Sequence, residues 1–182
     1  MLELSLHVLD IAENSTRAEA KHIFITIREN PERDRLTLEI RDDGVGMTEG
    51  ALANVLDPFY TTKKVRRVGL GLPMLAEAAG KTGGGLTVKS RPGEGTKVRV
   101  TFGLAHIDRQ PLGDIAGTLV TILTGHPDIE LVYRHERSGR SFVLDTREIR
   151  EEIGDIPLNH PEILAWIRSH VEEGLTEIKA GA

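Results

Sequence analysis

Three polar side chains near the start of the chain have a spacing that suits phosphate chemistry. Asp10, Asn14 and Arg17 are separated by four and three residues, which puts them on one face of a helix. An amide oxygen is a hard ligand suited to Mg²⁺, and a guanidinium neutralises phosphate charge. This face could hold a Mg²⁺–triphosphate, although a polar face on a first helix is more often only solvated.

A second candidate group lies at the end of a predicted strand. Asp42 and Asp43 lead into Gly44 and Gly46 in the pattern D-x-G-x-G. Glycines there let the backbone turn sharply and approach a flat ligand without a Cβ in the way. A carboxylate at the strand end can accept a hydrogen bond from an exocyclic amine. An ordinary turn after a strand explains the same pattern equally well.

Two more glycine segments follow. Gly69–Leu70–Gly71–Leu72 opens a predicted helix, whose first amides and dipole favour phosphate. Met74 stands where a dinucleotide-binding segment has its third glycine, and the chain has no P-loop pattern. Gly93–Glu94–Gly95–Thr96 reads first as a hairpin loop. Thr96, however, begins a strand that would lie beside the Asp42 strand, where its hydroxyl could support the same ligand.

The periodicity of apolar residues predicts the elements that carry these groups. Helical spacing is found at 2–20, 49–56 and 72–83, and alternating strand patterns at 22–30, 35–43, 85–90 and 96–104. This order favours helices on one face of a mostly antiparallel or mixed sheet, which is an α+β architecture.

Residues 105–182 have a different composition, with few clustered glycines. The pattern predicts a helix over 111–123, a hairpin over 129–146 about Ser138–Gly139, and a helix over 146–153. A last helix over 160–178, capped by Asn159, would bury a stripe. The residues of that stripe are Ile163, Trp166, Ile167, His170 and Val171. We interpret 105–182 as an accessory α+β region for dimerisation or partner docking, with a soft boundary near 104.

Four arginines of this region, Arg109, Arg134, Arg137 and Arg140, could bind an acidic partner. A plain hairpin surface is the favoured interpretation of them.

The amino-acid composition argues against several classes of function. The 182 residues carry 23 Lys and Arg against 28 Asp and Glu, a net charge of −5, and aromatics make up 4%. Both numbers argue against nucleic-acid binding. The chain has no Cys, which excludes disulfides, thiolate nucleophiles and iron–sulfur ligation. With no run of ~20 apolar residues and no leader-like N-terminus, we expect a cytoplasmic protein without a membrane partner.

Taken in order, these segments resemble the GHKL ATPases, the Bergerat-fold group of gyrase, heat-shock chaperone, histidine kinase and MutL types. HVLDIAENSTRA resembles the N-box, DDGVGM the first glycine box, DPFYTTK (57–63) the F-box, VGLGL the second glycine box and GEGTKVRV the closing G-x-G-T segment. The resemblance covers about 1–104 and is nearest to histidine kinase catalytic domains.

The resemblance implies a two-layer Bergerat-type sandwich of helices on a mixed sheet that binds ATP with Mg²⁺. Asn14 would bind Mg²⁺, Asp42 would read the adenine amino group, and Thr96 would support the adenine. The other implied nucleotide-binding residues are Arg17, Gly44, Gly46, Met47, Lys63, Gly69, Leu70, Gly71 and Leu72. For Lys63, which begins a basic run, a solvated loop is the alternative.

The kind of member stays open at this point. Asp10 takes the place of the carboxylate that activates water in hydrolytic members, whereas Arg17 takes that of the basic residue in kinases. The N-box begins almost at Met1, so we expect a stand-alone kinase or ATPase without its own phosphoacceptor domain, acting on a separate protein. The alternative is a non-catalytic ATP-sensing module that signals to a protein partner, and either form could be a homodimer.

Overall fold

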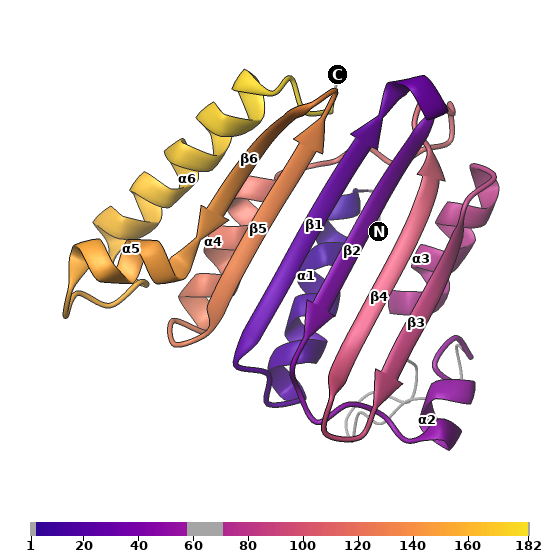
Figure 1. The fold of residues 1–182 in the computed structure, drawn as a ribbon, viewed down its shortest axis with the longest axis horizontal. Coiled ribbons are helices and arrows are strands. Elements are labelled where there is room, and N and C mark those ends of the chain that lie inside the picture. Colours follow the sequence, from indigo (N-terminus) through magenta and orange to yellow (C-terminus); the bar gives the residue numbers. More distant parts are fainter. Residues whose placement is uncertain (1–2, 58–70, 182) are drawn as a thin grey trace.

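The computed structural model describes residues 3–57 and 71–181. In this part of the chain six strands form one sheet, in the order β3-β4-β2-β1-β5-β6, and the longer helices cover one of its faces (Figure 1). The first half holds α1 (Leu4–Arg17), β1 (His22–Asn30), the 3₁₀ turn η1 (Pro31–Arg33), β2 (Arg35–Asp42), α2 (Glu49–Ala53) and α3 (Gly71–Lys81). The second holds β3 (Gly85–Arg91), β4 (Gly95–Gly103), α4 (Ile115–Gly125), β5 (Glu130–Arg137), β6 (Arg140–Asp145), α5 (Thr146–Ile153) and α6 (Pro161–Glu177).

The sheet is mixed. Neighbouring strands run antiparallel except β1 and β5, which are parallel. This arrangement confirms the predicted α+β class. None of the described helices is long and apolar enough to cross a membrane.

Alternation along the strands explains which face the helices cover. On β1, Ile23, Ile25 and Ile27 are at most 1% exposed, while the side chains between them point to the opposite, open face. The apolar stripe of α1, with Val8 and Ile11, packs into the same core. The two periods, 2.0 on the strand and 3.6 on the helix, therefore converge on one hydrophobic layer.

The C-terminal part joins this layer instead of standing apart. β5 pairs with β1 from His22↔Glu130 to Glu29↔Arg137, so that β5 and β6 extend the sheet of residues 1–104. Helix α4 packs against α1, and α6 packs against α4. One buried cluster of apolar side chains runs through both parts.

Two details of α6 correct the sequence prediction. The helix begins at Pro161, and its N-cap is His160, not Asn159; no side chain caps it. Proline suits the first helical position because its fixed φ is already helical and its missing N–H needs no partner there. In the predicted buried stripe, Trp166 is 50% exposed and stacks on His170.

The face of α6 that is buried instead follows Ile167, Val171 and Gly174. A Cβ at Gly174 would lie 2.0 Å from the Phe142 ring, so this glycine lets the helix approach β6 closely. The predicted stripe missed this contact because a glycine carries no apolar signal.

Candidate functional site

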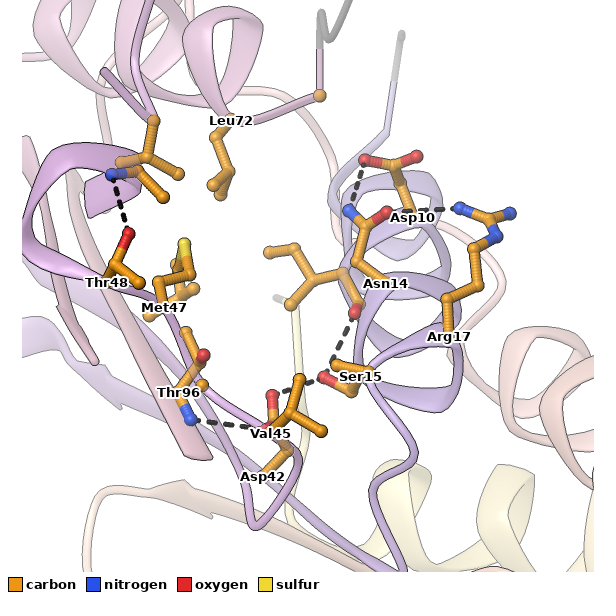
Figure 2. A pocket seen from close by; sticks show the side chains of 17 residues that line it. Asp10, Asn14, Ser15, Arg17, Asp42, Val45, Met47, Thr48, Leu72 and Thr96 are labelled. Carbon is orange, nitrogen blue, oxygen red and sulfur yellow. Dashed lines mark hydrogen bonds between the residues drawn. The ribbon is translucent and has the colours of Figure 1, made fainter. Parts of the chain in front are cut away.

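A cavity of about 520 Å³ opens on the helix side of the sheet, at the end of β2 and the start of β4 (Figure 2). One wall is α1, the other is formed by α2 and the start of α3, and Asp42 lies between them. The lining residues are Asp10, Ile11, Asn14, Ser15, Arg17, Ala18, Asp42, Val45, Gly46, Met47, Thr48, Ala51, Val55, Gly71, Leu72, Thr96 and Val98.

Asp42 is a buried carboxylate held from three sides. It is 6% exposed and ends β2 directly opposite Thr96. Its Oδ1 accepts hydrogen bonds from the backbone N–H groups of Gly44, at 3.0 Å, and Thr96, at 3.2 Å. Its Oδ2 accepts from the hydroxyl of Ser15 on α1, at 2.6 Å. Because each carboxylate oxygen has two lone pairs, Oδ2 keeps acceptor capacity for a ligand in the cavity.

Glycine is required at two positions around Asp42. Gly46 has φ +69°, and a Cβ there would lie 1.9 Å from the carbonyl oxygen of Arg91. Gly95 has φ +84°, and a Cβ there would lie 2.0 Å from the carbonyl oxygen of Asp42. The loop after β2 and the β3–β4 turn therefore pack backbone against backbone, which only a residue without a side chain allows.

Ser90 ties these two loops together. Its hydroxyl accepts from the N–H of Met47 at 2.9 Å and lies 2.8 Å from the Gly95 carbonyl oxygen and 2.9 Å from the Thr96 hydroxyl. Sequence reasoning did not select Ser90, and the only signal that could have found it is its pairing with Thr96 across β3 and β4.

The α1 wall brings the predicted polar face together. The Asn14 amide nitrogen lies 3.4 Å from the Asp10 carboxylate, and its amide oxygen accepts from the Arg17 guanidinium at 3.1 Å. Gly71, at the start of α3, comes so close to this wall that a Cβ would lie 1.9 Å from Asp10 Oδ2. The carboxylate of α1 and the first turn of α3 thus face the same part of the cavity.

The predicted site residues divide into three groups. Those that line the cavity are Asp10, Asn14, Arg17, Asp42, Gly46, Met47, Gly71, Leu72 and Thr96. Gly44 does not line it: its N–H holds Asp42, and a Cβ would lie 2.6 Å from the Ala18 carbonyl oxygen. Lys63, Gly69 and Leu70 lie outside the described residues.

The lining residues that sequence reasoning missed are mostly apolar. They are Ile11, Ser15, Ala18, Val45, Thr48, Ala51, Val55 and Val98. Thr48 is the N-cap of α2, where its hydroxyl accepts a hydrogen bond from the N–H of Ala51, and it also lines the cavity. An apolar slot with one fixed carboxylate suits a flat heterocycle that carries an amino group.

Comparison with known proteins places the first part of the chain in a family. Residues 2–106 match the family described as histidine kinase-, DNA gyrase B-, and HSP90-like ATPase. Two relatives from Bacillus subtilis are sensor histidine kinase YxdK, 39% identical over 75 residues, and sporulation kinase E, 38% identical over 81 residues. The aligned parts cover 39% and 44% of this chain but only 23% and 11% of those proteins.

A solved structure supports the fold over a longer stretch. The N-terminal domain of a DNA repair protein superposes with a TM-score of 0.55 at 16% identity, covering 80% of this chain and 53% of that one. The match of the family model over more than half of the residues shows that the chain belongs to the histidine kinase-, DNA gyrase B- and HSP90-like ATPase family, whose domain binds ATP.

Proposed function

We propose that the cavity binds Mg-ATP with the adenine against Asp42 and the triphosphate toward Asn14 and the start of α3. The observation that carries this proposal is the buried Asp42 carboxylate, which lines the cavity and is fixed by Ser15, Gly44 and Thr96. A fixed acceptor at that point matches the 6-amino group of adenine. It repels the O6 of guanine, which is also an acceptor, and so the site selects ATP over GTP.

The α1 wall fits a nucleotide-bound magnesium ion. Mg²⁺ prefers oxygen ligands and keeps several of its waters, so that one or two protein oxygens plus phosphates are enough to bind it. Asn14 supplies an oxygen of this kind at the cavity wall. Among the described residues, no cluster of three or more His, Asp and Glu forms a complete protein cage for a metal. Bound there, Mg²⁺ would neutralise phosphate charge.

The reaction we propose is transfer of the γ-phosphoryl group to an acceptor on a separate protein. Arg17 supports this assignment, because a guanidinium beside Asn14 can accompany the phosphate charge through the reaction. The names of the two Bacillus relatives, a sensor histidine kinase and a sporulation kinase, point the same way.

Hydrolysis is the second candidate, and the position of Asp10 favours it. Its carboxylate lies at the cavity wall against the first turn of α3, where it could orient or deprotonate a water molecule. An ATP-sensing role without turnover requires only that the cavity binds Mg-ATP.

Three measurements separate these activities. Calorimetric titration should show Mg-ATP binding that is weakened in Asp42→Asn. Phosphate release that falls in Asp10→Asn, with ATP binding retained, identifies an ATPase. Label transfer from [γ-³²P]ATP to a partner protein identifies a kinase. Tight binding with neither activity supports the sensor, and no binding by the parent chain overturns the whole proposal.

A further inference from the structure

Residues beyond the family match hold α1 at several points along its length. At its start, the N–H groups of Leu4 and Ser5 donate to the carbonyl oxygens of Pro111 and Leu112, at 3.0 and 2.9 Å. One turn later, the ring of buried His7 lies 3.1 Å from Gln110. Helix α4 packs along α1. The helix that carries Asp10, Asn14 and Arg17 is therefore positioned by the C-terminal part of the chain.

A further contact between the C-terminal part and α1 leads into the proposed nucleotide site. His126, the C-cap residue that directly follows α4, has its Nε2 3.2 Å from Glu13 Oε1 on α1. The other oxygen of Glu13 lies 3.7 Å from the Arg17 guanidinium. Arg17 in turn donates to Asn14 Oδ1. Three contacts thus connect the end of α4 with the oxygen that we assign to Mg²⁺.

The arrangement makes Arg17 and Mg²⁺ competitors. A guanidinium on Asn14 Oδ1 occupies a lone pair and places a positive charge beside the proposed metal position, which repels a second cation. Phosphate and the Glu13 carboxylate are anions that can draw Arg17 away from Asn14. At 3.7 Å its contact with Glu13 is longer than a hydrogen bond, whereas Glu13 is within hydrogen-bond distance of His126.

We propose that His126 is a positioning residue for the nucleotide site, which acts through Glu13 and Arg17 on the availability of Asn14 Oδ1 to magnesium. By engaging Glu13, His126 keeps that carboxylate from drawing Arg17 away from Asn14. The C-terminal part of the chain thereby sets the magnesium requirement of ATP binding. This inference rests on the proposed Mg-ATP site.

The test measures ATP affinity without magnesium and the magnesium concentration that gives half of the maximal gain in affinity. In His126→Ala, the freed Glu13 takes Arg17 from both Asn14 and phosphate. We expect magnesium-free ATP binding to weaken and the half-saturating magnesium concentration to fall, each about two- to fivefold, the range of an exposed charge contact.

Glu13→Gln should move the magnesium requirement the other way. The remaining attraction of Glu13 for Arg17 across 3.7 Å is lost, so that Arg17 binds Asn14 more firmly than in the parent and the half-saturating magnesium concentration rises. The double variant should behave like Glu13→Gln alone, because His126 has no other route to the site in this account. A general loosening of α1 would shift the half-saturating magnesium concentration in the same direction in His126→Ala and Glu13→Gln, whereas this account predicts shifts in opposite directions.

Two further variants serve as controls. His126→Gln retains an N–H donor for Glu13 and should match the parent in both measurements. His106→Ala removes a histidine of the same region whose ring faces Asp108, and it should change neither. An equal shift in His106→Ala, an unchanged His126→Ala, or shifts of one sign in His126→Ala and Glu13→Gln would each overturn the inference. If the parent chain does not bind ATP, the proposed function itself is wrong.

Discussion

Polar groups are used differently on the two sides of the boundary near residue 106. In the family-matched part, Asp42, Asn14 and Asp10 face a cavity, and the loops around them are set by close backbone contacts. At the junction with the C-terminal part, Glu29 and His135 face each other inside the protein. A polar group aimed at an opening can bind a ligand, whereas one enclosed by its partners fixes how two strands meet.

The enclosed network joins β1, β5 and the end of the chain. Glu29, whose side chain is fully buried, accepts from Arg137 at 2.6 Å and from the N–H of Gly181 at 2.8 Å, and lies 2.7 Å from the His135 ring. The other ring nitrogen of His135 lies 2.6 Å from the Tyr133 hydroxyl. Burial opposes the charge on Glu29, but these contacts outweigh it and lower the pKa of its carboxyl group.

The largest effect on stability should come from this network. Glu29→Ala leaves Arg137, His135 and the Gly181 N–H without their acceptor, and breaking a buried charge pair in this way costs about 3–5 kcal/mol. Urea unfolding monitored by circular dichroism measures the loss. Below the unfolding transition, ATP affinity should stay at the parental value. A cost under about 1 kcal/mol would mean that the network does not hold the two parts together.

Two glycines of the β3–β4 turn offer a sharper comparison on the cavity side. Gly95→Ala adds a Cβ against the Asp42 carbonyl oxygen, whereas Gly93→Ala, at φ +76°, meets nothing within 4 Å. Both variants should lose about 1 kcal/mol in free energy of unfolding, because alanine disfavours the left-handed conformation. Only Gly95→Ala should also weaken ATP binding, because it displaces the strand end that holds Asp42. Equal ATP affinities in the two variants would contradict this placement of the site.

Helix caps provide a smaller contrast between the same two regions. Asp114 caps α4 by accepting a hydrogen bond from the N–H of Gly117 at 2.7 Å. This hydrogen bond and an ion pair with Arg168 lower the pKa of the Asp114 carboxyl group. Asp114→Ala should cost about 1 kcal/mol of stability, as lost caps do. Thr48→Ala removes the cap of α2, a five-residue helix with no buried residue, so that its effect should appear in ATP affinity and not in the unfolding curve. Thermal melts and ATP titrations of both variants check the contrast.

The smallest effect is a pH dependence at the exposed corner between α1 and β1. The side-chain hydrogen bond to Asp43 raises the pKa of His22. Partial burial works against the charge on the Asp43 carboxylate. Hydrogen bonds from the N–H groups of His22 and Lys21 and from the His22 ring outweigh burial and lower the pKa of Asp43. Stability from His22 is complete below its ordinary value of 6.5 and is lost as the pH rises through the raised pKa.

Stability from Asp43 has the opposite sign: it is present above its ordinary value of 3.8 and is lost as the pH falls through the lowered pKa. The pair therefore contributes most between these two values. Because both side chains are more than a third exposed, the contribution should be about 0.5 kcal/mol. Asp43→Asn should reduce the slope of the stability profile above pH 6, while the part due to Glu130, 2.9 Å from the other ring nitrogen of His22, remains. An unchanged profile would show that the contact with Asp43 does not contribute to stability.

The sequence predicted most elements because their signals are local. Alternation located β1 and β2, and Ser138–Gly139 located the hairpin, where both residues have positive φ. The pairing of β5 with β1 has no local signal, since it joins residues more than a hundred positions apart. Gly174 and Ser90 were not predicted for a related reason. Each acts through a partner on another element, and the spacing of residues within one segment does not reveal such a partner.

Nucleotide selectivity in the Asp42 variant tests the central claim most directly. Titrations of ATP and GTP into the parent chain and Asp42→Asn, at fixed magnesium, should show ATP preferred by the parent. ATP affinity should fall about 10- to 100-fold in the variant, as expected for one hydrogen bond to a buried charge. GTP affinity should stay unchanged or rise, because the variant can turn an amide N–H toward O6. Equal binding of ATP by the two proteins would contradict the account.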